Sequence, residues 1–217
     1  MKNGLVLFVG AFAVIGLSSA GVLLSAHNQF GALTQYKDPI EETLHPAPLR
    51  GTADRGRMVY QDLGCVSCHT QQVRREGFGG DIARQWGVRQ SVARDYIREK
   101  TVFLGHSRIG PDLRNAAARP YADAEYFYKL LYAPASVAPG TNMPSYAFLF
   151  EVRPIPPGQP SPHALQLTGK YAAPAGHEVV PTPRAVALVA YLRSLNDTYE
   201  YPEAAPYVPA VKQGGGH

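Results

Sequence analysis

The sequence predicts a mainly α-helical fold in which one N-terminal transmembrane helix precedes a small domain with long irregular segments. Three observations lead to this prediction. Residues 4–26 form an uncharged apolar run, and several later segments have the apolar spacing of amphipathic helices. The 217 residues also include 21 Gly and 19 Pro, which interrupt regular elements. With 45% apolar residues, the chain can still form a packed core.

The N-terminal run is long enough to serve as a membrane anchor. At ~1.5 Å per residue, its 23 residues would span roughly 35 Å as a helix, and the apolar core of a bilayer is about 30 Å thick. A signal peptide cleaved after Leu24-Ser25-Ala26 is the alternative, but its apolar core would usually have only about 7–15 residues. We therefore expect a retained anchor. Lys2 is the single charge before it and weakly favours an N-terminus inside the cell.

Four further helices are expected, at residues 55–63, 91–100, 123–132 and 185–195. Residues 52–54 are expected to cap the first of them and Gly64 to end it. Pro183 lies just before the last helix, at an early helical position. The predicted apolar face of that helix consists of Val186, Val189, Ala190 and Leu192.

Composition suggests where the domain begins and ends. Residues 151–183 contain eight prolines and predict no regular element. The resulting division is a transmembrane anchor at 1–27, an extended linker at 28–50, a domain at 51–197 with a Pro-rich insert at 151–183, and an irregular tail at 198–217.

Residues 74–119 hold ten basic and five acidic residues, but the whole chain carries only +4 and shows no basic, aromatic groove. Nucleic acid is therefore not expected as a partner.

The only two cysteines, Cys65 and Cys68, stand in the sequence Cys-Val-Ser-Cys-His. C-x-x-C-H is the attachment signature of a c-type haem. Two thiols at this spacing lie one turn apart and reach two vinyl groups of one macrocycle, and His69 then presents its imidazole to the iron. The motif predicts one covalently bound haem c with His69 as the proximal ligand.

Other uses of the cysteine pair fit the sequence less well. A thioredoxin-like redox pair would need a βαβ context. A zinc site would need a fourth ligand beyond Cys65, Cys68 and His69, and there is no second cysteine pair. A disulfide between such close neighbours would close only a very short loop.

Met143 is the favoured second axial ligand of the iron. Of the other two methionines, one begins the chain and Met58 lies on the helix that leads into the cysteine motif. A thioether in an irregular loop can reach the distal face of a haem, and Met ligation raises the haem potential relative to two histidines. His106 and His163 are the alternatives, and Met143 could also simply fill a gap in the core.

The segment Arg-Ile-Gly-Pro-Asp-Leu at 108–113 contains two further candidates. A proximal histidine usually donates its other ring N–H to a backbone carbonyl, and Pro111, whose φ is fixed, is the candidate to provide that carbonyl to His69. A plain turn is the alternative. Arg108 is the candidate to neutralise the haem propionates through charge-assisted hydrogen bonds.

The first and last helices of the domain are expected to cross. Gly56 and Tyr60 lie on the first of them, and Tyr191 and Leu192 on the last. A glycine lets another backbone approach closely. We therefore expect the crossing at Gly56, beside the haem edge.

Together these segments resemble a class I cytochrome c domain. More closely, they resemble the membrane-anchored monohaem subunit of cbb(3)-type cytochrome c oxidase, the second subunit of that complex. The resemblance rests on C-V-S-C-H-T-Q-Q-V-R at 65–74, R-I-G-P-D-L at 108–113, N-M-P-S-Y at 142–146 and A-L-V-A-Y-L at 187–192. The Pro-rich residues 151–183 and the tail depart from the family pattern.

The resemblance implies an electron-transfer subunit that is not an enzyme by itself. Cys65 and Cys68 would bind the haem, His69 and Met143 would ligate its iron, and Pro111 would support His69. Electrons would come from another c-type cytochrome subunit or donor. They would pass to haem b in the large haem–copper oxidase membrane subunit, where oxygen is reduced. The chain would cross the bacterial inner (plasma) membrane once, surrounded by membrane lipid, with its cytochrome domain in the periplasm.

Three other functions fit part of the sequence. The small c-type subunit of a nitric oxide reductase shares the plan of an anchor and one haem, but the long insert before Gly110 and the N-M-P-S-Y loop favour the oxidase. A free-standing anchored electron shuttle would have a smaller domain. A haem-based sensor would need an output module, and none is apparent.

Overall fold

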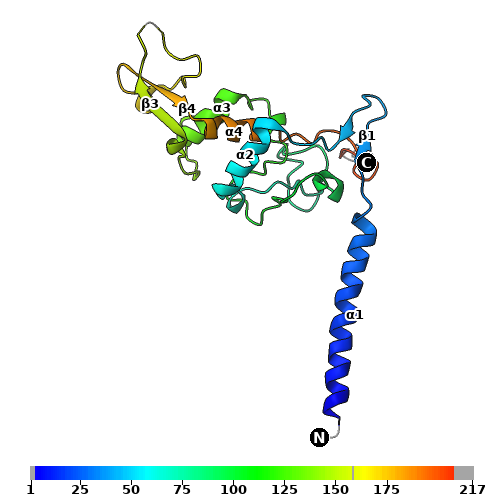
Figure 1. Ribbon diagram of the computed structural model, residues 1–217. Coiled ribbons are helices and arrows are strands. Elements are labelled where there is room, and N and C mark those ends of the chain that lie inside the picture. The colour runs from blue at the N-terminus through cyan, green and yellow to red at the C-terminus, as the bar shows by residue number, and fades with distance from the viewer. Residues whose placement is uncertain (1–2, 158, 208–217) are drawn as a thin grey trace, which may run out of the picture. The chain divides into compact units, whose positions relative to one another are not determined.

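The computed structural model describes residues 3–157 and 159–207. The chain divides into two compact units (Figure 1), of which one is Met1–Pro46 with Val92–Glu99 and the other is Ala47–Ser91 with Lys100–His217. Regular structure in the described residues is mainly helical, which confirms the predicted fold class. The α-helices are α1 at Gly4–Phe30, α2 at Gly51–Asp62, α3 at Ala124–Tyr132 and α4 at Pro183–Leu192.

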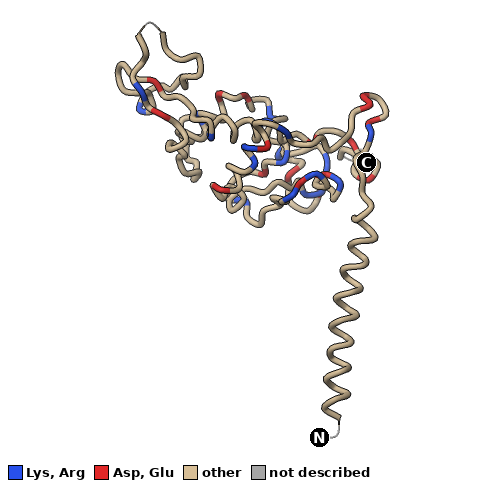
Figure 2. Tube along the Cα trace, in the orientation of Figure 1, with Lys and Arg blue, Asp and Glu red and all other residues tan. Residues whose placement is uncertain are grey.

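The helix α1 is long and apolar enough to cross a membrane. It extends four residues beyond the predicted run and ends where the Gly31 N–H donates to the His27 carbonyl at 2.7 Å. It carries no Lys, Arg, Asp or Glu (Figure 2), and none of its residues is buried. An uncharged apolar surface of this size requires lipid or another protein to cover it.

The remainder of the first unit is small and mostly irregular. Strands β1, Tyr36–Lys37, and β2, Leu44–His45, form a short antiparallel pair. The predicted helix at 91–100 is wrong, because only a 3₁₀ turn at Ala93–Tyr96 forms there. The Asp95 carboxylate accepts the Val92 N–H at 2.8 Å, and such local side-chain bonding competes with helix extension.

The helix α2 begins four residues earlier than predicted, and the predicted cap at residues 52–54 is wrong. No side chain caps its N-terminus. Instead, Asp54 forms an ion pair with Arg57 at 3.6 Å within the first turn, and the Thr52 hydroxyl accepts from Arg55. The end of the helix is as predicted, since Gly64 has φ +68° and turns the chain into the cysteine motif.

The helices α2 and α4 cross at Gly56, as predicted. A Cβ atom at Gly56 would lie 1.8 Å from the Ala187 carbonyl oxygen, so only glycine permits this approach. The predicted apolar face of α4 is only partly right, because Val189 and Leu192 are buried but Val186 is 39% exposed. The buried face also includes Ala185, Ala187, Leu188 and Tyr191.

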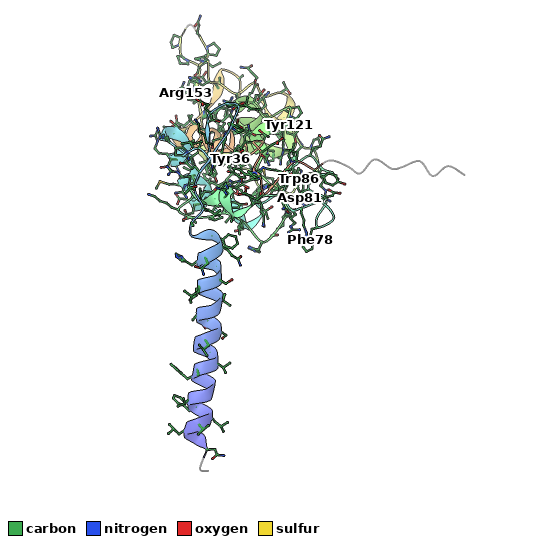
Figure 3. The ribbon with its side chains drawn as sticks, turned by 90° about the vertical axis from the view of Figure 1, so that its right-hand side faces the viewer. Tyr36, Phe78, Asp81, Trp86, Tyr121 and Arg153 are labelled. Carbon is green, nitrogen blue, oxygen red and sulfur yellow. The ribbon has the colours of Figure 1, made fainter. Side chains whose placement is uncertain are left out.

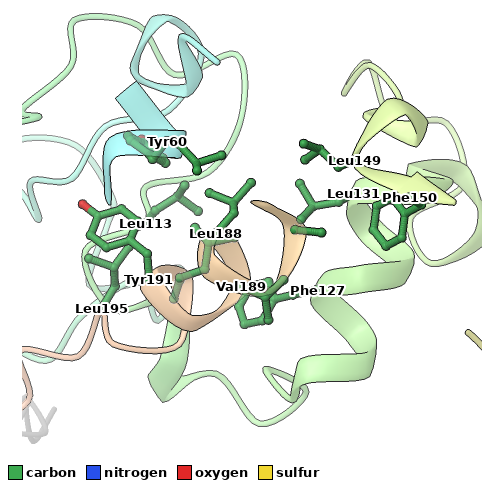
Figure 4. Packing of buried hydrophobic residues seen from close by; sticks show 14 of the residues in the cluster. Tyr60, Leu113, Phe127, Leu131, Leu149, Phe150, Leu188, Val189, Tyr191 and Leu195 are labelled. Carbon is green, nitrogen blue, oxygen red and sulfur yellow. The ribbon is translucent and has the colours of Figure 1, made fainter. Parts of the chain in front are cut away.

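One hydrophobic core joins the three helices of the second unit. Tyr60 of α2, Phe127 and Leu131 of α3, and Leu188 and Val189 of α4 are all at most 4% exposed and pack together (Figure 4). The Asp123 carboxylate caps α3 by accepting the Tyr126 N–H at 2.7 Å, which agrees with the helix predicted at 123–132.

The prediction of no regular element at 151–183 is wrong. Strands β3, Phe150–Pro154, and β4, His177–Pro181, pair antiparallel, with Val152 opposite Val179. Pro154 and Pro181 occupy the last position of their strands, and both strands are edges of a two-stranded sheet, where proline is tolerated. Five other prolines fall in the connection between the strands. The prolines therefore limit the strands without preventing them.

The described part of the tail packs against the domain. The Arg89 guanidinium lies 5.3 Å from the ring centre of Tyr199 and 4.8 Å from that of Tyr201. The Tyr207 N–H donates to the Val88 carbonyl at 2.9 Å. Residues 208–217, the rest of the predicted irregular tail, lie outside the described residues.

Candidate haem site

The cysteine motif forms a short 3₁₀ turn, Cys65–Ser67, directly after α2. The His69 N–H donates to the Cys65 carbonyl at 3.0 Å, which closes the turn. Both thiols are free and partly buried. The end of α2 and the left-handed Gly64 therefore place Cys65, Cys68 and His69 on one compact turn.

The imidazole of His69 has a fixed orientation. Its Nδ1 lies 2.8 Å from the Pro111 carbonyl oxygen, as predicted. Because a carbonyl only accepts, Nδ1 carries the proton and Nε2 carries the lone pair. Burial lowers the pKa of His69, and the hydrogen bond to Pro111 opposes this change. The neutral imidazole that results is the form that binds a metal.

Gly110 makes close contact with the same ring. A Cβ atom at Gly110 would lie 2.3 Å from His69 Cε1 and 2.7 Å from Nδ1. The Gly110 N–H also donates to the Cys68 carbonyl at 2.9 Å. The segment 110–111 therefore holds the histidine both by a hydrogen bond and by direct packing.

The loop that carries Met143 lies against the cysteine motif. Burial raises the pKa of the Cys65 thiol to about 11, and the neighbouring Tyr146 hydroxyl opposes this change. The end of α3 anchors this loop, since the Tyr146 N–H donates to Leu131 at 2.8 Å and the Ser145 hydroxyl to Tyr132 at 2.5 Å.

Of the candidates for the second ligand, Met143 is partly buried and packs against the core. Met58 is 58% exposed on α2. His106 and His163 are both exposed. Met143 is thus partly buried, whereas the other candidates described are exposed to solvent.

Arg108 lies in a buried polar cluster. Its guanidinium donates to the Thr70 hydroxyl at 2.9 Å, to the Gln72 carbonyl at 2.7 Å and to the Asp81 carboxylate. It also lies 5.6 Å from the ring centre of Trp86, and Figure 3 shows Trp86 and Asp81 close together. These are protein contacts, and the predicted bond from Arg108 to a haem propionate stays a prediction.

Sequence reasoning missed the importance of Asp112 and Thr70. Asp112 is 0% exposed, and its carboxylate accepts the Thr70 hydroxyl at 2.6 Å. Both residues stand next to functional candidates, His69 and Pro111. The available signal was an acidic residue directly after Pro111 in an otherwise apolar loop segment.

The residues present fit a haem attached through two cysteines. The site offers two free thiols, a neutral imidazole with a fixed tautomer and a thioether in a loop beside the thiols. Ile109, which precedes Gly110, and Phe148, which lies five residues after Met143, are 67% and 66% exposed, and large exposed apolar side chains suit contact with an apolar macrocycle. Within residues 3–157 and 159–207, no three His, Cys, Asp or Glu side chains are grouped to hold a metal ion themselves.

A mainly helical domain with this site, preceded by one apolar helix, is a cytochrome c domain with an N-terminal anchor. The family model for the cytochrome c oxidase mono-heme subunit, FixO, matches residues 2–154, and the chain belongs to this family. It is thus a monohaem, electron-transport subunit of a cytochrome c oxidase. A comparison with curated proteins gives no match.

Proposed function

We propose that this subunit relays single electrons from a c-type donor to the haem b and haem–copper subunit of the oxidase. One observation carries the proposal: the imidazole that follows two free thiols directs its Nδ1 proton to the Pro111 carbonyl, 2.8 Å away, and so keeps Nε2 for a metal. One covalently attached haem c would supply the one-electron redox chemistry. Oxygen reduction is assigned to the partner chain.

Each residue of the site has a defined role in this proposal. Cys65 and Cys68 would hold the macrocycle through two thioether bonds, and His69, oriented by Pro111, would bind the iron. Met143 would be the second ligand of the iron, and the position of its loop, whose Tyr146 lies near Cys65, supports this role. A thioether ligand raises the haem potential relative to a second histidine, which suits a subunit that accepts electrons from another c-type cytochrome.

We also propose how the chain is placed in the cell. The helix α1 crosses the bacterial inner (plasma) membrane once, in contact with lipid and with the large oxidase subunit. Residues 51–197 form the haem domain on the periplasmic side, because c-type haem attachment needs thiols that are handled outside the cytoplasm.

The composition of the purified complex tests the proposed function. The tagged chain is isolated in mild detergent and assayed for haem types and metals. Haem c together with haem b and copper is the expected result. Haem b with non-haem iron and no copper would instead indicate nitric oxide reduction. Haem c alone would indicate an anchored shuttle.

The role of Met143 is tested by Met143→Ala, with Met58→Ala as the matched control. We expect the Met143 variant to keep its covalent haem but to have a lower midpoint potential, since the thioether that favours the reduced iron is lost. The control, an exposed methionine on α2, should keep the wild-type potential. An unchanged potential in Met143→Ala would remove this residue from the ligand role.

A further inference from the structure

Residues 68–72 and residues 110–114 are hydrogen-bonded to each other on both sides of the contact between His69 and Pro111. The Gly110 N–H donates to the Cys68 carbonyl at 2.9 Å, and the Leu113 N–H donates to the Thr70 carbonyl at 2.8 Å. These bonds flank the contact of His69 Nδ1 with the Pro111 carbonyl. The geometry of the histidine therefore depends on how segments 68–72 and 110–114 are held against each other.

The Asp112 side chain connects the same two segments. One carboxylate oxygen accepts the Thr70 hydroxyl at 2.6 Å and the Gln72 N–H at 2.8 Å. The other accepts the Arg114 N–H at 2.8 Å. Thr70 follows His69 in the sequence and Asp112 follows Pro111, so each is covalently adjacent to one partner of the histidine hydrogen bond.

Arg108 contacts the same group of residues. Its Nε donates to the Thr70 hydroxyl, which in turn donates to Asp112, so the order of donors and acceptors is fixed. Its Nη2 donates to the Gln72 carbonyl and lies 3.6 Å from the Asp112 carboxylate. The Asp112 side chain is 0% exposed, and in such a low-dielectric site both its charge and its hydrogen bonds act strongly.

We propose that Asp112 is a positioning residue which, through Thr70 and the backbone on either side, sets the His69–Pro111 hydrogen bond and thereby the reduction potential of the haem. This inference rests on the proposed function, in which His69 ligates the iron. A hydrogen bond from Nδ1–H raises the basicity of a ligating imidazole. The buried negative charge also favours the oxidised iron, which carries one more positive charge. Both effects lower the potential in the wild-type protein.

The test is Asp112→Asn in the full chain, isolated with its partner subunits. We expect the haem to stay covalently attached and its midpoint potential to rise. At the wild-type midpoint, the ratio of reduced to oxidised haem should increase about tenfold, which is about 59 mV for a one-electron couple. Thr70→Val should raise the potential less, and Thr70→Ser, which keeps the hydroxyl, should leave it at the wild-type value.

Glu178→Gln is the control for a purely structural effect. Glu178 is 4% exposed and also accepts a backbone N–H and an arginine, but it lies on β4. This variant should lose stability without a change in potential. If Asp112→Asn and Thr70→Val lose stability but keep the wild-type potential, the inference is wrong. If the Asp112→Asn protein does not accumulate, the difference in midpoint potential between Thr70→Val and Thr70→Ser tests the inference by itself.

The same experiment separates failure of this inference from failure of the proposed function. A wild-type preparation without covalent haem c would contradict the proposed function before any variant is compared. A normal wild-type haem with unaltered potentials in the variants would contradict only the role of Asp112.

Discussion

At the scale of single residues, the segment 110–111 holds the His69 ring in two ways. The Pro111 carbonyl accepts from Nδ1, and Gly110 lies so close that a Cβ atom there would be 2.3 Å from Cε1. The hydrogen bond fixes the tautomer, whereas the absent Cβ leaves room for the ring. The His69 ring can keep this position and its hydrogen bond to Pro111 only if residue 110 has no side chain.

Gly110→Ala is therefore expected to displace the imidazole. The added methyl group must push either the ring or the 110–111 backbone aside, at a cost of about 1–3 kcal/mol in stability. We expect a lower unfolding temperature and a visible spectrum with a fraction of high-spin haem, because the proposed bond between the iron and His69 would be weakened.

Gly77→Asn is the matched control for this substitution. Gly77 has φ +77°, a Cβ atom added there would have no other atom within 4 Å, and asparagine tolerates this conformation. Its spectrum should equal that of the wild type. A low-spin Gly110→Ala protein of wild-type stability would show that the close contact does not constrain the ring.

The sequence predicts those site residues that stand in a short motif. Cys65, Cys68 and His69 are adjacent, and Pro111 could be chosen because a rigid carbonyl was needed for the histidine. Asp112 could not be paired with Thr70 in this way, since 42 residues separate them. A buried carboxylate and a solvated one look the same in a single sequence, and only the fold decides between them.

At the scale of elements, the crossing of α2 and α4 holds the second unit together. The two backbones meet where Gly56 faces Ala187, and the aromatic rings of Tyr60 and Tyr191 pack edge to face beside it at 5.4 Å between centres. The chain enters the cysteine motif directly from α2. The crossing therefore helps to position the helix from which Cys65 follows.

Gly56→Ala is expected to destabilise the domain strongly. Its methyl group would meet backbone atoms of α4, which cannot move aside as a flexible side chain does, so the two helices must separate. We expect a loss of about 3 kcal/mol or more, at or above the upper end of the usual range for overpacking, measured by denaturant unfolding. Arg55→Ala, an exposed change on the same helix, should alter stability by less than about 0.5 kcal/mol.

The β3–β4 pair should respond to pH through Glu178. The pKa of Glu178 lies below its ordinary value of 4.5, chiefly because the Ser161 N–H donates to the carboxylate, and Arg153 adds to this effect while burial opposes it. A lowered pKa means that the stabilisation is complete above the pKa of the unfolded chain. It is lost as the pH falls through the lower pKa of the folded protein.

Glu178→Gln should therefore unfold at a lower temperature than the wild type at pH 7, and this difference should shrink below about pH 4. Thermal unfolding across the pH range measures it. Glu151→Gln, an exposed change on β3, should match the wild type throughout. A difference between Glu178→Gln and wild type that grows on acidification would contradict the assigned sign.

Element predictions failed where local composition and tertiary pairing disagree. The eight prolines at 151–183 argue against any strand, yet two five-residue strands form because Pro154 and Pro181 lie on strands that are both edges of their sheet. The predicted apolar face of α4 is only partly right, because Val186 is exposed. The helix packs against both α2 and α3, and Ala185, Ala187 and Leu188 are buried as well.

At the scale of the whole molecule, α1 provides the attachment to a membrane. Its 27 residues would span about 40 Å at ~1.5 Å per residue, more than the roughly 30 Å of a bilayer core. No residue of the helix is buried by the protein. The apolar surface of the helix is therefore available to lipid or to another protein.

Replacing Gly10 and Gly16 of α1 by arginine should prevent stable insertion. An arginine at the centre of a membrane helix costs about 2.5–3.5 kcal/mol on insertion scales. Gly16 lies near the centre of α1 and Gly10 in its N-terminal half, and a Cβ atom added at either position meets no other segment of the chain within 4 Å. We expect the double variant to leave the membrane pellet on alkaline carbonate extraction, whereas Gly10→Leu with Gly16→Leu stays. Retention of the arginine variant in the carbonate-washed membrane would show that a segment other than α1 anchors the chain.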